Sequence, residues 1–420
     1  MAHPSAVPEH LPSLRWWVRF LSVAGPGIVV MLADTDVGSI VTAAQSGASW
    51  GYRLLLLQIL LVPILFVVQD LTVRLGLVTG KGHGELIREH FGPGWAWASV
   101  SSLVVACAGA LLTEFVGVVA VGQFVGVPAW ASLALAAGFL LVVVWTGSYR
   151  RVELVAILLG AFELAFIWLA VAAHPDGRAV ATGLSHLPIR DHAYLYLVAA
   201  NIGAVLMPWM VFYQQSAVVD KGLGPEHLHY ARWDTAVGTI VTQIMMAAIL
   251  ITVAATIGTT HPGTSLGSVE EIANALTPFL GSGTAHVLLG LGILGAAMVA
   301  SVVVTLAAAW GVGEVAGYRH SLDQGPRAAP WFYGLFSLVV VTTAVVVGFV
   351  KDLVSLTIGV QVMNALLLPL VLGLLFQLAR RALPPPYRPR GAYAAVVGSL
   401  ILVVSVLGVF GGLGGILRIV

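Results

Sequence analysis

Charged residues are scarce in this chain. Asp, Glu, Lys and Arg make up 9% of its 420 residues, whereas hydrophobic residues make up 59%. A soluble domain carries about 25% charged residues, so too little charge is present to cover a water-facing surface of this size. A soluble enzyme is therefore excluded, and so is a disordered chain, which needs low hydrophobicity. The composition indicates a polytopic membrane protein whose main partner is the lipid bilayer.

Cysteine is almost absent as well. The single cysteine, Cys107, lies in an apolar run, which excludes a disulfide and a cysteine-type metal site. The net charge of +1 leaves no basic surface for nucleic acid. We expect no permanently bound cofactor, and no obligatory protein partner is evident.

Long apolar runs dominate what is present. Windows of about 20 apolar residues mark candidate transmembrane helices. The runs are continuous rather than alternating, which predicts helices and not a barrel. The prediction is an all-α membrane protein of about 11 spans. These are residues 24–46, 52–79, 95–122, 130–147, 153–173, 193–219, 233–258, 285–316, 331–350, 353–378 and 392–417.

Basic residues predict the orientation. Residues 1–23 have no basic start and no small-residue cleavage site around an apolar core, so they differ from a signal peptide. We predict a cytoplasmic tail that ends in an aromatic and basic interface anchor. Fifteen of the 20 Lys and Arg residues fall on the side of the N-terminus. This bias predicts an inner-membrane protein with its N-terminus inside and its C-terminus outside.

Two spans carry helix breakers halfway along. The first contains Gly25-Pro26-Gly27 and then the polar stretch 34–39, and the sixth contains the stretch 201–208 with Pro208. Broken helices at matching places in two halves indicate an inverted-repeat transporter with a site at the bilayer midplane. We expect one transporter domain, 24–420, with repeats at about 24–173 and 193–378 and an extra helix at about 392–417.

Acidic residues lie within these apolar runs. Placing a carboxylate in hydrocarbon costs at least about 2.5–3.5 kcal/mol of free energy, so the presence of Asp34 and Asp36 within an apolar run needs an explanation. Two residues apart, they would point to different sides of an intact helix, whereas an unwound segment lets both face a cavity. We expect Asp36 to bind a cation and Asp34 to act directly or through water; the alternative is a helix-capping role. Asp70 precedes Arg74 by four residues, which predicts a structural ion pair.

The break in the sixth span offers other ligands. Pro208 lacks an amide donor and so frees the carbonyl oxygen of Ala204. Met207 supplies a soft thioether, which suits late or borderline transition metals more than Mg2+; simple packing is the alternative. Such irregular backbone is tolerated at this depth only around a cavity.

Further polar groups occur deep in other spans. Glu114 could relay protons or cations or be held neutral by burial, and for Glu163 we favour the neutral, structural interpretation. Gln214 and Gln361 could line a pathway or bridge helices. The sequence does not separate these alternatives.

Together these motifs resemble the NRAMP family of divalent-metal transporters. The resemblance covers nearly the whole chain and implies the LeuT-like five-plus-five inverted-repeat fold, with helices 1 and 6 broken. It also implies a metal site formed by the Asp36 carboxylate, the Ala204 carbonyl and the Met207 thioether, approached by Gln361. The matching regions are Gly25-Pro26-Gly27 with Asp36-Val37-Gly38, residues 74–81, residues 203–208, and Gln361 followed by Pro369.

The chain departs from that family at its metal site. Val37 replaces a proline, Ser39 replaces an asparagine ligand, and Asp34 adds a carboxylate that the family usually lacks. More oxygen charge around a shorter side chain suits an ion that keeps part of its water shell, as Mg2+ does. The pattern looks like the NRAMP-related magnesium branch, although the retained Met207 favours Mn2+ or Fe2+.

The family's proton route is also altered. Its two histidines after the sixth-span proline correspond here to Trp209 and Gln214. Its acidic pair in the third span is reduced to Glu114, with Leu111 at the other position. Tryptophan and glutamine carry no titratable proton at physiological pH, so we expect weak or absent proton coupling. Trp209 would gate the inner path by its bulk.

The sequence therefore predicts an alternating-access importer of divalent cations, not an enzyme, with Mg2+ slightly preferred over Mn2+. The first alternative is a proton-coupled Mn2+ or Fe2+ transporter of the NRAMP type. The second is a cation-coupled symporter of an organic solute on the same fold. An intramembrane enzyme or a channel is disfavoured, because the spans contain no catalytic dyad and no repeated pore ring.

Overall fold

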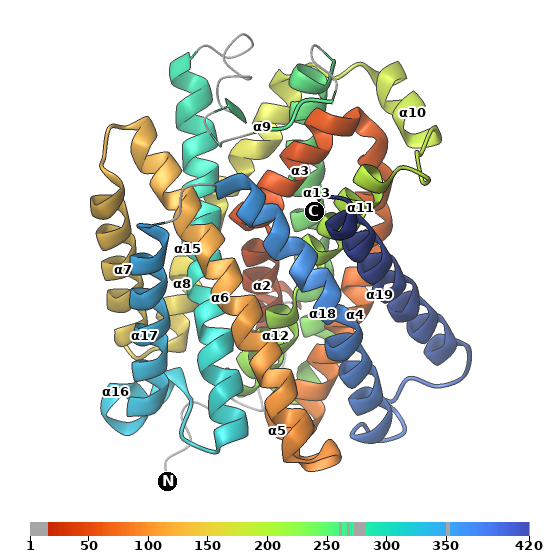
Figure 1. Cartoon of the computed structure of the whole chain (residues 1–420). Helices are drawn as coiled ribbons and strands as arrows, with labels where there is room; N and C mark the ends of the chain where they lie inside the picture. The colour runs from red at the N-terminus through yellow and green to blue at the C-terminus, as the bar shows by residue number, and fades with distance from the viewer. Residues whose placement is uncertain are drawn as a thin grey trace.

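The chain folds into a bundle of long helices that run between two faces (Figure 1). The structure is a computed structural model that describes residues 16–259, 263–266, 269, 271–272, 282–349 and 353–419. In these ranges every regular element is a helix, which confirms the all-α prediction. Residues 1–15 of the predicted tail and Lys351 lie outside the described residues.

The eleven predicted spans correspond to helices of the structure. Nine stretches of the described residues are long and apolar enough to cross a membrane, and the shorter α7 (Ala129–Trp145) adds to them. One stretch, Val37–Thr79, contains the end of the first predicted span and all of the second, because η1 (Gly51–Leu54) joins them without a loop. The remaining elements in chain order are α2 (Pro26–Asp34), α3 (Val37–Trp50), α4 (Leu55–Thr79), α6 (Pro93–Phe124), α8 (Tyr149–Gly160), η2 (Ala161–Leu164), α9 (Ala165–Ala172), α11 (His192–Val205), α12 (Pro208–Asp220), η3 (Pro225–His227), α13 (Leu228–Val253), η4 (Ala254–Gly258), α15 (Ser282–Ala316), α17 (Pro330–Val347), α18 (Leu353–Arg381) and α19 (Gly391–Ile419).

Several short helices were not predicted as separate elements. The end of the predicted tail forms α1 (Trp16–Val23), and α5 (His83–Phe91) and α10 (Gly177–Ser185) lie in connections. The others are η5 (Leu322–Gln324) and α16 (Gly325–Ala328). They are too short for a scan that looks for 20 apolar residues. The start of α5 is fixed locally, because the Glu85 carboxylate accepts the Gly82 N–H at 2.9 Å.

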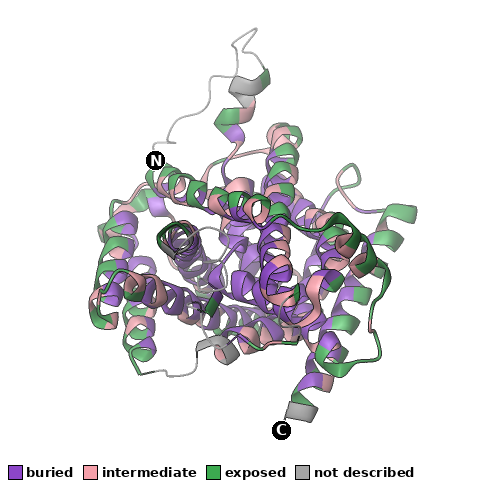
Figure 2. Cartoon of the chain, turned by 90° about the horizontal axis from the view of Figure 1, so that it is seen from above, coloured by how far each residue is buried: buried purple, intermediate pink, exposed green. Residues whose placement is uncertain are grey.

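Burial separates the central helices from the peripheral ones. In the span formed by α11 and α12, 89% of the most apolar window is buried, whereas the span from α8 to α9 reaches only 28%. Seen from above, buried residues fill the middle of the bundle and exposed residues line its outside (Figure 2). Large apolar side chains such as Trp130 and Phe410 are exposed on that outer surface, as expected for contact with lipid. The two broken helices thus belong to the buried interior.

The first break lies between α2 and α3. Asp36 has extended backbone angles, and its side chain accepts the Ser39 N–H as the N-cap of α3. The second break lies between α11 and α12, where Pro208 occupies the first turn of α12 and has no amide to continue the hydrogen-bond ladder. Both predicted breaks are confirmed, and each has a local cause.

Helix α18 packs closely against both breaks. A Cβ atom at Gly38 would collide with the Gln361 side-chain nitrogen, and one at Gly203 would collide with the Gln361 carbonyl oxygen. Both glycines are therefore required for close approach, and Gln361 contacts both broken helices.

Candidate metal centre

Asp36 is held at the start of α3 with one oxygen engaged and one unpartnered. Its Oδ1 accepts the Ser39 N–H at 2.6 Å, and the Gln361 amide nitrogen lies 3.5 Å from the same oxygen. Its Oδ2 is buried and has no hydrogen-bond partner among the residues that the structure describes. The whole residue is shielded from solvent. An unsatisfied carboxylate oxygen in such a place is costly unless a cation or a proton compensates it.

Ser39 connects the two breaks directly. Its hydroxyl donates to the Ala204 carbonyl oxygen at 2.9 Å, and both residues are fully buried. The Ala204 carbonyl is available because position 208, where the ladder would supply its donor, is proline. Two oxygen groups from sequence positions 165 residues apart therefore lie together beside Asp36.

Met207 and Trp209 form a pair within the second break. The Trp209 indole Nε1–H donates to the Met207 sulfur at 3.1 Å. Trp209 is fully buried and Met207 is 2% exposed. One lone pair of the thioether is therefore occupied by a hydrogen-bond donor, an arrangement that sequence reasoning did not identify.

Asp34 ends α2 and also has an unpartnered oxygen. Its Oδ2 accepts the Thr242 hydroxyl at 3.3 Å, and Thr242 lies 2.9 Å from the Thr35 hydroxyl. Its Oδ1 is buried and has no hydrogen-bond partner in the described part of the chain. Asp34 and Asp36 are close enough to interact electrostatically.

Two glutamates complete a group of four acidic residues. The Glu114 carboxylate accepts the Val37 N–H at 3.2 Å and the Thr113 hydroxyl at 3.2 Å, so it satisfies the first free amide of α3. Glu163 lies beside Thr35 and within electrostatic range of Asp34. Among the described residues, neither of its oxygens makes a hydrogen bond of ordinary distance and angle. Sequence reasoning placed Glu163 near no other polar signal, whereas the fold brings it to the first break.

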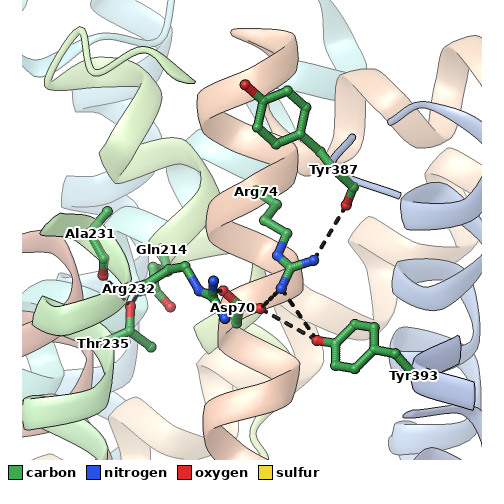
Figure 3. A network of polar contacts seen from close by, with 8 residues as sticks. All are labelled: Asp70, Arg74, Gln214, Ala231, Arg232, Thr235, Tyr387 and Tyr393. Carbon is green, nitrogen blue, oxygen red and sulfur yellow. Dashed lines mark hydrogen bonds and ion pairs between the residues drawn. The ribbon is translucent and has the colours of Figure 1, made fainter. Parts of the chain in front are cut away.

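Gln214 lies further along α12 and points to α13. Its amide nitrogen donates to Thr235 at 2.8 Å, and Thr235 donates to the Ala231 carbonyl at 3.0 Å (Figure 3). Its partners are therefore in α13 and do not include any of the predicted ligands. The expectation that Gln214 lines a pathway stays a prediction, and bridging of helices is the contact the structure shows.

The donor set lacks a strong chelate. In the part of the chain that the structure describes, no three His, Cys, Asp or Glu side chains are arranged to hold one metal ion. A cation at Asp36 would be held by that carboxylate, the oxygen groups of Ser39 and Ala204, the Met207 sulfur, and water. Such a sparse protein set is typical of ions that remain partly hydrated.

Sequence reasoning missed a carboxylate that fixes the first broken helix. Asp234 of α13 accepts three backbone N–H groups from residues 25–28, at 2.7 to 3.2 Å. Lys221 adds to this, because its ammonium group donates to the Ala24 carbonyl at 2.8 Å and pairs with Glu153 at 2.8 Å. A carboxylate at a helix N-terminus is favourable, but its partners are about 200 positions away, so no local pattern reveals it.

The predicted pair of Asp70 and Arg74 is confirmed and is part of a larger group (Figure 3). Arg232 of α13 lies 2.8 Å from the other oxygen of Asp70. The Tyr393 hydroxyl of α19 lies 3.5 Å from Asp70. One buried carboxylate thus joins α4, α13 and α19.

Comparison with known proteins identifies relatives along most of the chain. A curated relative from Acidiphilium cryptum, divalent metal cation transporter MntH, is 28% identical over an alignment of 435 positions that covers 97% of this chain and 95% of that protein. A protein of the same name from Ralstonia nicotianae is 30% identical over 303 residues, 68% of this chain and 67% of that one.

Solved structures share the architecture. The crystal structure of the Eremococcus coleocola manganese transporter superposes with a TM-score of 0.80 at 18% identity, covering 96% of this chain and 88% of that one. MhsT in complex with L-phenylalanine superposes with a TM-score of 0.63 at 12% identity, covering 93% and 98%. The LeuT-like fold is therefore confirmed, and it is shared by proteins with unlike ligands. The Nramp family model, described as natural resistance-associated macrophage protein-like, matches residues 27–412, and this chain therefore belongs to the Nramp family.

Proposed function

We propose that this chain is a secondary transporter that carries divalent metal cations inward across the cytoplasmic membrane by alternating access. The observation that carries the proposal is the unpartnered, buried oxygen of Asp36 at the point where two broken helices meet. Family membership and the relatives named divalent metal cation transporter agree with it. None of these features requires an enzymatic reaction.

In this proposal Asp36 provides the charge that anchors the ion. Ser39 and the Ala204 carbonyl supply oxygen ligands directly or through water, and Asp34 adds a second negative charge. Gln361, already 3.5 Å from Asp36, closes over the ion from α18. Because every one of these groups is buried, the arrangement fits an occluded state between outward and inward access.

Transport would proceed by rocking of the broken helices against the rest of the bundle. We keep the predicted repeats, 24–173 and 193–378, as the two halves of this motion, with α19 outside both. The hydrogen bonds from residues 25–28 to Asp234 would have to break when α2 moves. The predicted orientation, with the N-terminus inside, would place this contact on the inner side of the site.

For the metal, we propose a slight preference for Mg2+ over Mn2+. Oxygen ligands and bound water suit Mg2+, and the hydrogen bond from Trp209 to the Met207 sulfur weakens the ligand that would favour Mn2+. The alternative, a transporter for Mn2+ or Fe2+, is favoured by the presence of that sulfur at the break, where its second lone pair is not used by Trp209.

We further propose that proton coupling is weak or absent, because Trp209 and Gln214 cannot carry protons. One observation favours the coupled alternative, namely the group of four acidic residues around the first break. A symporter of organic anions is disfavoured, because carboxylates at the break would repel an anionic ligand that a half-helix N-terminus would otherwise bind.

The test is uptake of Mg2+ and Mn2+ into proteoliposomes with an internal pH dye. We expect the wild type to take up both ions without acidification, and Asp36→Asn to take up neither. Glu226→Gln is the matched control, because it removes an exposed carboxylate and should leave uptake unchanged. No uptake of either ion by the wild type, or full uptake by Asp36→Asn, would reject the proposal. Acidification that accompanies uptake would establish the coupled alternative.

A further inference from the structure

A cavity of about 700 Å3 lies between the end of α18 and the start of α19. Three arginines line it: Arg380 at the end of α18, and Arg388 and Arg390 in the connection that leads to α19. Phe376 and Leu402 line it from the apolar parts of the two helices. This cavity, here called the α18–α19 pocket, is separate from the candidate metal centre.

The pocket carries unbalanced positive charge. Among the described residues, no acidic side chain lines it, and none of its three arginines forms an ion pair. Arg388 uses its Nε to donate to the Leu383 carbonyl at 2.9 Å, and Arg380 lies over the Phe376 ring at 5.9 Å; these contacts leave terminal guanidinium N–H groups for a ligand. The first residue of α19, Gly391, also lines the pocket, so the positive end of a 29-residue helix adds to the arginines.

The pocket also continues into an apolar surface. Leu402, one of its lining residues, is 64% exposed, and Val396 and Val403 on α19 are more than half exposed. Small residues such as Ala394 and Ala395 form the wall between the arginines and Leu402. A ligand that fits has an anionic end for the guanidinium groups and a long apolar part that lies along α19.

We propose that the α18–α19 pocket binds an anionic membrane phospholipid, with the phosphate at the three arginines and an acyl chain along α19. Guanidinium groups match phosphate oxygens in bidentate geometry, and basic pockets between membrane helices on the cytoplasmic side bind anionic head groups. Free phosphate shares the anionic chemistry but has nothing to place on the apolar wall. The proposal does not depend on which metal the protein transports.

A bound lipid would contact the connection between α18 and α19, which is already hydrogen-bonded to α4. The Arg74 guanidinium donates to the Tyr387 carbonyl at 3.4 Å and reaches the Tyr393 hydroxyl at 3.5 Å (Figure 3). Tyr387 and Tyr393 flank Arg388 and Arg390 in the sequence. Lipid in the pocket should therefore stabilise the contact between α4 and α19.

The experiment is native mass spectrometry and thermal unfolding of the full chain in detergent, titrated with phosphatidylglycerol, phosphatidylcholine or inorganic phosphate. We expect phosphatidylglycerol to bind at least tenfold more tightly than phosphatidylcholine and to raise the unfolding temperature. The triple variant Arg380→Gln/Arg388→Gln/Arg390→Gln should bind both lipids equally weakly. Inorganic phosphate that binds or stabilises as well as the lipid would overturn the proposal.

A control variant removes the same charge elsewhere. Arg150→Gln/Arg151→Gln/Arg381→Gln changes three arginines that do not line the pocket, so it should keep the preference for phosphatidylglycerol. Equal losses in the two triple variants would show general charge attraction and reject the site. If the pocket variant fails to fold, Ala395→Trp replaces it as the test, because a tryptophan there fills the pocket without changing its charge. We expect this variant to bind phosphatidylglycerol more weakly, and undiminished binding would refute the proposal.

Discussion

Replacement of Trp209 by phenylalanine tests whether its contact with Met207 at the second break sets the preference between Mn2+ and Mg2+. The change keeps most of the buried ring and removes the indole N–H that donates to the Met207 sulfur at 3.1 Å. The sulfur then has both lone pairs available. We expect Trp209→Phe to bind Mn2+ more tightly relative to Mg2+, because a thioether is a useful ligand for Mn2+ and a poor one for Mg2+.

The size of the shift follows from the bond that is lost. A hydrogen bond contributes about 0.5–1.5 kcal/mol net, and a tenfold change in affinity is about 1.4 kcal/mol. The Mn2+-to-Mg2+ affinity ratio should therefore rise about 2- to 12-fold. The smaller phenylalanine ring also leaves space beside α12, but that packing loss affects both metals and cancels in the ratio.

The assay is competition of the two metals for uptake into proteoliposomes, measured in four proteins: wild type, Trp209→Phe, Met207→Leu and the double variant. Met207→Leu removes the sulfur and nearly preserves the side-chain volume. The double variant should therefore have the same Mn2+-to-Mg2+ ratio as Met207→Leu alone. This double-mutant cycle isolates the contact between the two residues. An unchanged ratio in Trp209→Phe, or an equal shift in the background without sulfur, would refute the reasoning.

Three further variants test how the bundle is held together. Both carboxylate oxygens of Asp234 accept N–H groups from residues 25–28, and Asp234→Asn replaces one of them with an amide nitrogen. We expect this change to lower the free energy of unfolding by about 1–3 kcal/mol, which thermal unfolding in detergent would show as a lower midpoint. Burial lowers the pKa of His83 from 6.5 to about 4, so the unfolded chain binds a proton there first. The contribution of His83 to stability should therefore be constant above about pH 6.5 and fall by about 3 kcal/mol between pH 6.5 and pH 4. His83→Gln should remove this contribution, seen as a smaller loss of thermal midpoint on acidification than in the wild type. Gly203→Ala places a methyl group against the Gln361 carbonyl and should cost about 1–3 kcal/mol or more, whereas Gly359→Ala, which meets no neighbour within 4 Å, should be tolerated; equal midpoints for these two would contradict the packing argument.

The features that sequence reasoning predicted are those with local causes. Transmembrane runs follow from composition over about 20 residues, and the break at Pro208 follows from a single missing amide. The ion pair of Asp70 with Arg74 follows from a spacing of four on one helix. Each of these can be recognised without knowing how the helices pack.

The features that were missed depend on partners distant in the chain. Arg232 approaches Asp70 and Asp234 binds the start of α2, and neither pairing is marked by spacing. Glu163 lies in an apolar run, where the sequence indicated only a buried, neutral carboxyl group. Packing of that run against the first break brings Glu163 near Asp34. The hydrogen bond from Trp209 to the Met207 sulfur is local. Predicting it nevertheless requires knowing that the helix restarts at Pro208 and that the indole points back toward residue 207.

The surroundings of the first break explain why losing the family's histidines need not remove the demand for a cation. Asp36 and Glu163 lie within electrostatic range of each other and of both Asp34 and Glu114. Their hydrogen-bond donors in the described residues are hydroxyl, amide and backbone N–H groups, with no Lys or Arg among them. Dipoles of this kind cannot neutralise four carboxylates in a buried site, so bound cations or protons must supply the opposite charge. In the proposed function, Trp209 and Gln214 stand where the resemblance implies proton-carrying histidines and so remove a proton route, while the need for bound positive charge at Asp36 is unchanged. We therefore propose that cation binding and proton coupling are separable properties of this bundle.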